Sequence, residues 1–161
     1  MAGTGDVETV ERFIPTPPEP IFELLVYPHQ HPLIDGSGQV REAKGDSERL
    51  ALGSTFGMKM KAGLSYSMVS EVIEFEEGRR IAWQTRPPSS IGAKLAGGRI
   101  WRYELEPVDG GTVVRESWDI SQEKVKAIVR PARNKSRQSM EKTLARIEEL
   151  VTSDAAGASG P

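Results

Sequence analysis

Residues 97–120, GGRIWRYELEPVDGGTVVRESWDI, decide the fold, because they hold two runs of alternating side chains on either side of a turn. Alternation of apolar and polar residues is typical of β-strands that bury one face. The turn from Val108 to Gly111 is short and has glycine where a positive φ is expected. The stretch therefore predicts an antiparallel hairpin with strands over about 97–107 and 111–120.

Strand patterns also occupy the chain before this hairpin. Further strands are expected over about residues 39–45, 53–62, 64–76 and 80–86. A first strand over about 6–14 is rich in β-branched residues and ends at Pro15. Six consecutive strands after it imply an antiparallel meander. The connection from Arg86 to Gly98 is too long for a hairpin turn and is a candidate for a lid.

Helical patterns flank the strands. A short helix is expected after Thr16 and before Pro28, and a single helical turn follows His29. The apolar residues that recur at helical spacing near the end of the chain are Met140, Leu144, Ile147 and Val151. Their spacing predicts a long amphipathic helix over about 134–152. The remaining residues, 153–161, are small and polar and are expected to be disordered.

The composition excludes several classes of protein. With 21 basic and 23 acidic residues the net charge is −2, and no basic block stands out, so we expect no nucleic-acid partner. The absence of cysteine excludes disulfides, thiolate metal sites and cysteine nucleophiles. The apolar runs are far shorter than the roughly 20 residues that span a bilayer. We therefore expect a cytoplasmic protein with no membrane span.

Four stretches of the chain carry a resemblance to a known superfamily. They are residues 14–25 (IPTPPEPIFELL), 71–83 (EVIEFEEGRRIAW), 101–107 (WRYELEP) and 110–118 (GGTVVRESW). With the order of the elements, they resemble the START-like, or SRPBCC, superfamily and its polyketide cyclase/dehydrase-like branch, over about residues 6–151.

The resemblance implies an α+β helix-grip fold: a seven-stranded antiparallel curved sheet wrapped around a long C-terminal helix, with two short helices after the first strand. It also implies a deep cavity between the sheet and the helix for sterols, polyketides, fatty acids or other apolar compounds. We accordingly divide the chain into a flexible N-terminus (1–5), a helix-grip ligand-binding domain (6–152) and a disordered tail (153–161).

The period of two assigns side chains to the inner face of the sheet. In the strand after Gly98, Arg99, Trp101 and Tyr103 share the face expected to point inward. The expected ligand-binding residues are Phe56, Met58, Met60, Tyr66, Met68, Trp83, Arg99, Trp101, Tyr103, Glu116, Trp118, Ser136 and Met140. Aromatic and methionine side chains suit apolar ligands, although the same residues could fill an ordinary core. The strand over 64–76 contains two registers, which a bulge near Val69 to Glu71 would reconcile.

Few polar residues are candidates for chemistry inside such a cavity. Arg99 and Glu116 could form a buried pair that orients a carbonyl or carboxylate, or a structural salt bridge. His29 and His31 are the natural general acid or base, but in a proline-flanked segment surface positions are more common. Asp35 could join them, although an Asx turn explains it without chemistry. The candidate catalytic residues are His31, Arg99, Tyr103 and Glu116.

The leading hypothesis is a protein that binds a small hydrophobic metabolite, lipid or polyketide-like ligand, for transport or sequestration, as a monomer or weak homodimer. The alternative is a cyclase or dehydratase in which Arg99 or Tyr103 polarises a ketone and His31 or Glu116 moves a proton. A third class is a partner protein that works through an apolar patch on the outer face of the sheet. No motif for a cofactor is present, and the two histidines lack the spacing of a metal site.

Overall fold

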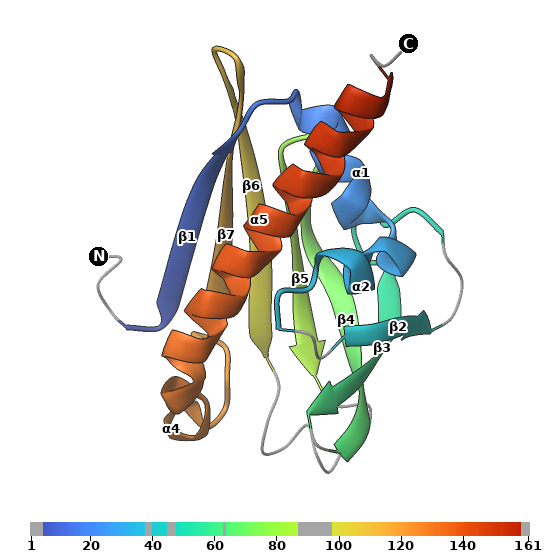
Figure 1. Ribbon diagram of the computed structural model, residues 1–161. Helices are drawn as coiled ribbons and strands as arrows, with labels where there is room; N and C mark the ends of the chain where they lie inside the picture. Colours follow the sequence, from blue (N-terminus) through green and yellow to red (C-terminus); the bar gives the residue numbers. More distant parts are fainter. Residues whose placement is uncertain (1–4, 38–39, 45–47, 63, 87–97, 159–161) are drawn as a thin grey trace.

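The computed structural model describes residues 5–37, 40–44, 48–62, 64–86 and 98–158. In these residues seven antiparallel strands form one sheet, in the order β1-β7-β6-β5-β4-β3-β2, which curves around a long helix (Figure 1). The strands are β1 (Val7–Ile14), β2 (Val40–Lys44), β3 (Thr55–Ala62), β4 (Leu64–Glu76), β5 (Arg80–Arg86), β6 (Arg99–Val108) and β7 (Gly111–Asp119). The predicted α+β helix-grip architecture is confirmed.

Two short helices follow β1, as expected. The helical segments are α1 (Pro18–Val26), η2 (Pro28–Gln30), α2 (His31–Ile34), α4 (Lys126–Val129), η3 (Arg130–Ala132) and α5 (Arg133–Ala158). The long helix α5 continues to Ala158, so residues 153–158 are helical where we expected disorder to begin. The candidate lid over residues 87–97 lies outside the described residues.

A bulge in β4 resolves the two registers of this strand, but at a different place from the one expected. Pairing with β3 is regular from Leu64 to Glu71, and the register with β5 shifts between Val72 and Glu74. The extra residue at Ile73 turns both Val72 and Phe75 toward the interior, since Val72 is fully buried and Phe75 packs edge-on against Phe22. The predicted bulge at Val69 to Glu71 was therefore wrong by a few residues.

The long helix α5 crosses the concave face of the sheet, and its two halves differ (Figure 1). From Leu144 onward the inward side chains Leu144, Ile147 and Val151 are buried in the core. Ion pairs of Arg133 and Arg137 with Glu8, and of Arg12 with Glu148, attach the helix to β1. Toward its N-terminal end the inward positions carry mainly small side chains, such as Ser136 and Ser139. Small side chains cannot reach the sheet, so this half of the helix leaves a hollow beneath it.

Candidate ligand-binding cavity

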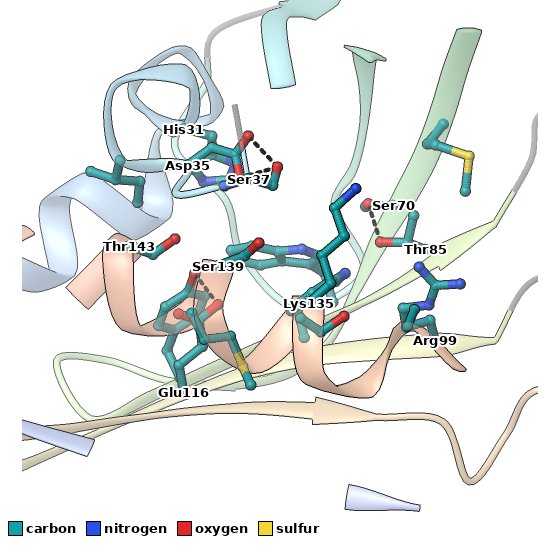
Figure 2. A pocket seen from close by; sticks show the side chains of 18 of the residues that line it. His31, Asp35, Ser37, Ser70, Thr85, Arg99, Glu116, Lys135, Ser139 and Thr143 are labelled. Atoms are coloured by element: carbon teal, nitrogen blue, oxygen red, sulfur yellow. Dashed lines mark hydrogen bonds between the residues drawn. The ribbon is translucent and has the colours of Figure 1, made fainter. Parts of the chain in front are cut away.

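A cavity of about 370 Å³ lies between the concave face of the sheet, α2 and the N-terminal half of α5 (Figure 2). Its size falls within the range of pockets that hold small organic ligands. The lining residues are His31, Ile34, Asp35, Ser37, Phe56, Met68, Ser70, Trp83, Thr85, Arg99, Trp101, Tyr103, Glu116, Ala132, Lys135, Ser136, Ser139, Met140 and Thr143.

Cross-strand pairing arranges the sheet side of the cavity in three rows. Ser70 pairs with Thr85, which pairs with Arg99, and the two hydroxyl oxygens are 2.8 Å apart. The next inward row contains Trp83 opposite Trp101. The third row places Tyr103 opposite Glu116. The cavity therefore has a polar row at one end of the strands, an aromatic row in the middle and a hydrogen-bonded pair deeper inside.

The deep pair consists of a phenol and a carboxyl group. The Tyr103 hydroxyl donates a hydrogen bond of 2.8 Å to Oε2 of Glu116. Glu116 is only 3% exposed, and its other oxygen, Oε1, has no hydrogen-bond partner. Burial raises the pKa of Glu116 to about 8, against the smaller lowering effect of the Tyr103 hydrogen bond. At neutral pH this carboxyl group is protonated and can donate a hydrogen bond to a bound molecule.

His31 lies in the wall of the cavity and not on the surface. The side chain is 5% exposed, stacks on Trp83 with ring centroids 4.9 Å apart, and meets Phe56 edge-on. Its Nε2 lies 2.8 Å from the carbonyl oxygen of Leu25. A carbonyl only accepts, so Nε2 carries the proton and donates. Burial lowers the pKa of His31 to about 4, so the ring is neutral at pH 7. We expected both histidines at the surface, and only His29 is exposed.

The expected pair of Arg99 with Glu116 does not form. Glu116 faces Tyr103 across the strands, and the row of Trp83 and Trp101 separates it from Arg99. The Arg99 guanidinium instead lies near a carboxylate that precedes α4, with Nε 3.6 Å from Oε2 of Glu123. The prediction was wrong because alternation assigns a face to each residue but not its level along the strand.

The loop after α2 closes another side of the cavity by contact with α5. The amide of Gly36 donates to Oγ1 of Thr143 at 2.8 Å, and Arg146 donates to the carbonyl oxygen of Asp35 at 2.7 Å. The Asp35 carboxylate accepts hydrogen bonds from the amide and hydroxyl of Ser37. The Ser37 amide bond is that of an Asx turn, so Asp35 has the structural role that we considered for it.

Comparison with known proteins identifies the family. The family model described as "Polyketide cyclase / dehydrase and lipid transport" matches residues 7–152. The chain belongs to this family. A curated relative, Uncharacterized protein Rv0088 of Mycobacterium tuberculosis, is 32% identical over 121 residues, which are 73% of this chain and 49% of that protein. The chain thus spans about half the length of the curated relatives it matches.

Solved structures share the fold of this family member. Protein NE0264 from Nitrosomonas europaea superimposes with a TM-score of 0.70 at 15% identity, covering 95% of this chain and 98% of that one. Protein Ms6760 from Mycobacterium smegmatis gives a TM-score of 0.69 at 14% identity and covers 93% of both chains. The AHSA1-like protein from Aeromonas hydrophila gives 0.64 at 16% identity and covers 94% of both. At these identities the likeness shows the fold alone.

The structure brings most of the predicted ligand-binding residues together around the cavity. Those that line it are Phe56, Met68, Trp83, Arg99, Trp101, Tyr103, Glu116, Ser136 and Met140. Trp118 does not line it: the side chain is 0% exposed and belongs to the core, where α5 packs against β1 and β7. The side chains of Met58, Met60 and Tyr66 lie outside the described part of the structure.

Sequence reasoning missed several lining residues at the start of α5. Lys135, Ser139 and Thr143 share a face of α5 with Ser136 and Met140, so the three-and-four spacing could have identified them. Ala132, which also lines the cavity, lies in η3 just before this helix. Thr85 shares the inward face of β5 with Trp83 by simple alternation, although it was not among the expected ligand-binding residues. Ser70 carried no such signal, because the register of β4 was open until the bulge was located.

Metal and membrane sites find no support in the part of the chain that the structure describes. No group of three or more His, Asp or Glu side chains there is arranged to hold a metal ion. Nor does any helix there combine the length and apolar character needed to cross a bilayer. The polar groups that line the cavity include Tyr103, Glu116, His31 and the row at Arg99.

Proposed function

We propose that the protein binds a small, largely apolar molecule in this cavity and holds an oxygen of that molecule with Glu116. The observation that carries the proposal is Oε1 of Glu116, which is buried at the cavity wall without a hydrogen-bond partner. An unsatisfied buried polar group costs about 1–3 kcal/mol. A ligand with a carbonyl or hydroxyl oxygen next to Glu116 would remove that cost.

The aromatic side chains support a flat or flexible apolar body for this ligand. The rings of Trp83 and Phe56 meet edge-on, with centroids 5.5 Å apart, and Trp83 also contacts Tyr103. Rings in such arrangements offer large apolar area with few rotatable bonds, so little entropy is lost when a ligand packs against them. Family membership is consistent with an apolar ligand, because the family description includes lipid transport.

Filling the cavity from the helix tests the proposal. Ser139 lines the cavity, so Ser139→Phe is expected to occupy the space and weaken binding at least about ten-fold. Because Trp83 and Trp101 line the same space, tryptophan fluorescence can follow titrations with fatty acids, fatty alcohols, sterols and aromatic ketones. The matched control is Gln138→Phe, on an exposed position of α5, which is expected to bind like the wild type. If the wild type binds no compound, or if Ser139→Phe binds equally well, the proposal is wrong.

Acid catalysis on the bound molecule is a second candidate function, and the protonation of Glu116 favours it. A carboxyl group with a pKa of about 8, hydrogen-bonded to Tyr103, can give a proton to a ketone oxygen or a leaving hydroxyl. His31 is less suited, because its one protonated nitrogen already donates to Leu25. If a cyclase or dehydratase activity is found, Glu116→Gln is expected to lower kcat about 100-fold or more while binding survives. Equal rates would exclude the role.

A partner protein on the outer face of the sheet is not favoured. In the described strands that face carries an ion-pair network, in which Glu74 bridges Arg80 and Arg102, and Arg102 also reaches Asp119. This part of the outer face is therefore polar, although Phe13 and Val108 are exposed near the ends of β1 and β6, and nothing in the described residues points to a partner there. The cytoplasmic location and the monomeric or weakly dimeric state remain predictions from the sequence.

A further inference from the structure

The two ends of the cavity differ in charge. The deep end contains Tyr103 and a protonated Glu116, so it has no formal charge at neutral pH. The other end contains the guanidinium of Arg99 beside the Ser70 and Thr85 hydroxyl pair. Figure 2 shows the Lys135 side chain extending from α5 in the direction of this row. One end of the cavity is therefore cationic and rich in hydrogen-bond donors.

The cationic end is not neutralised within the described residues. Lys135 takes part in no ion pair there, and Arg99 has one, at 3.6 Å, with Glu123. Among these three groups, two positive charges and one negative charge leave one positive charge at this end of the cavity. The Asp35 carboxylate, which also lines the cavity, lies beside His31 and away from Arg99 (Figure 2), and it accepts hydrogen bonds from Ser37. A ligand group with a single negative charge would balance this end of the cavity.

We propose that the ligand is an amphipathic monoanion, with a carboxylate held by Lys135 and Arg99, an apolar body between them and the deep pair, and an oxygen acceptor at Glu116. This inference rests on the proposed function and names its ligand class. An anion that leaves water for the cavity needs charged donors to replace part of its hydration, and among the described lining residues the two cations, Arg99 and Lys135, lie at this end. Doubly charged phosphate esters fit less well, because Glu123 already offsets one of the two cations.

The strand geometry sets the length of such a ligand. Arg99 and Tyr103 are four residues apart on β6, with one inward row between them. At about 3.3 Å per residue, the two anchoring levels are about 13 Å apart. A medium-chain ω-hydroxy fatty acid has the required pattern, with a carboxylate at one end, a hydroxyl at the other and only methylene groups between.

The test compares ω-hydroxy fatty acids of increasing chain length with their methyl esters, by calorimetry at neutral pH and low ionic strength. The acid of the best length is expected to bind about ten-fold or more tightly than its ester, because only the acid pairs with the two cations. In Lys135→Gln this preference is expected to shrink toward equality. Lys142→Gln, an exposed position of the same helix that does not line the cavity, is expected to keep it.

The outcomes separate this inference from the proposed function. If esters and acids bind equally to the wild type, the anion site is wrong, and binding of an apolar molecule stands. If acids are preferred but Lys135→Gln keeps the full preference, the carboxylate lies elsewhere and the assignment is wrong. If neither acids nor esters bind but a neutral compound of the wider panel does, the proposed ligand class is wrong, and binding of an apolar molecule in the cavity still stands. If nothing in either panel binds, both proposals fail.

Discussion

Between pH 6.5 and pH 8 the wild-type protein is expected to lose about 2 kcal/mol of its free energy of unfolding, and the Glu116→Gln variant is not. Burial raises the pKa of Glu116 from its ordinary value of 4.5 to about 8. Throughout that window the native state holds a proton that the unfolded chain has released. Stability therefore falls as the pH rises, by about 1.4 kcal/mol for each unit, until the native group also ionises.

His31 has the opposite effect on the acid side. Burial lowers its pKa from 6.5 to about 4, so below pH 6.5 the unfolded chain binds a proton that the native ring does not. Its contribution is lost as the pH falls through this window. Between pH 4.5 and pH 6.5 the two effects cancel, and these two groups together predict a plateau followed by a decline above pH 6.5.

Urea denaturation at a series of pH values, followed by circular dichroism, measures these profiles. Glu116→Gln should remove the decline above pH 6.5. Tyr103→Phe should move the end of the decline to higher pH, because the Tyr103 hydrogen bond lowers the pKa of Glu116. Parallel profiles for the wild type and Glu116→Gln would mean that Glu116 is ionised in the folded protein. The hydrogen-bond donor assigned to the deep end of the cavity would then be absent.

Replacing Gly36 by alanine is expected to destabilise the protein by about 1–3 kcal/mol and to weaken ligand binding. A Cβ atom at this position would lie 2.1 Å from the carbonyl oxygen of Ser139 and 2.7 Å from the amide nitrogen of Thr143. Backbone atoms of a helix cannot move aside cheaply. The loop must therefore leave α5, which breaks the hydrogen bond from Gly36 to Thr143 and opens one wall of the cavity.

Thermal unfolding and the fluorescence titration measure the two effects of Gly36→Ala. One of the close atoms, Cβ of Lys142 at 2.6 Å, belongs to a side chain, so Gly36→Ala is also compared in a Lys142→Gly background. The loss should persist there, because the contacts with the helix backbone remain. Full recovery of stability in that background, or wild-type stability of Gly36→Ala itself, would show that the loop does not depend on close contact with α5.

The architecture could be predicted because each element carries a local signal. The alternation in β6 and β7 and the spacing of Leu144, Ile147 and Val151 depend only on neighbouring residues along the chain. The bulge at Ile73 was misplaced because its position is set by pairing with β5, which the sequence of β4 alone does not contain. The end of α5 was misplaced because small polar residues are compatible with both helix and coil.

The site was predictable in its apolar part and less so in its polar part. The inward faces of Trp83, Trp101 and Tyr103 follow from the period of two. The partner of Glu116 does not, because Arg99 and Tyr103 share that face and only the strand register decides between them. Trp118 was assigned to the cavity because alternation shows which side chains point inward but not whether they line a cavity or pack in the core. The burial of His31 depends on the path of α2 over the sheet, for which the chain has no periodic signal.

Different segments of α5 determine the stability of the fold and the space available to a ligand. Substitutions at Leu144, Ile147 or Val151 change the free energy of folding, whereas those at Ser136 or Ser139 change how much room a guest molecule has. Substitutions at a few serine positions of α5 can therefore change the volume of the cavity, by design or by mutation, without changing the core that surrounds it.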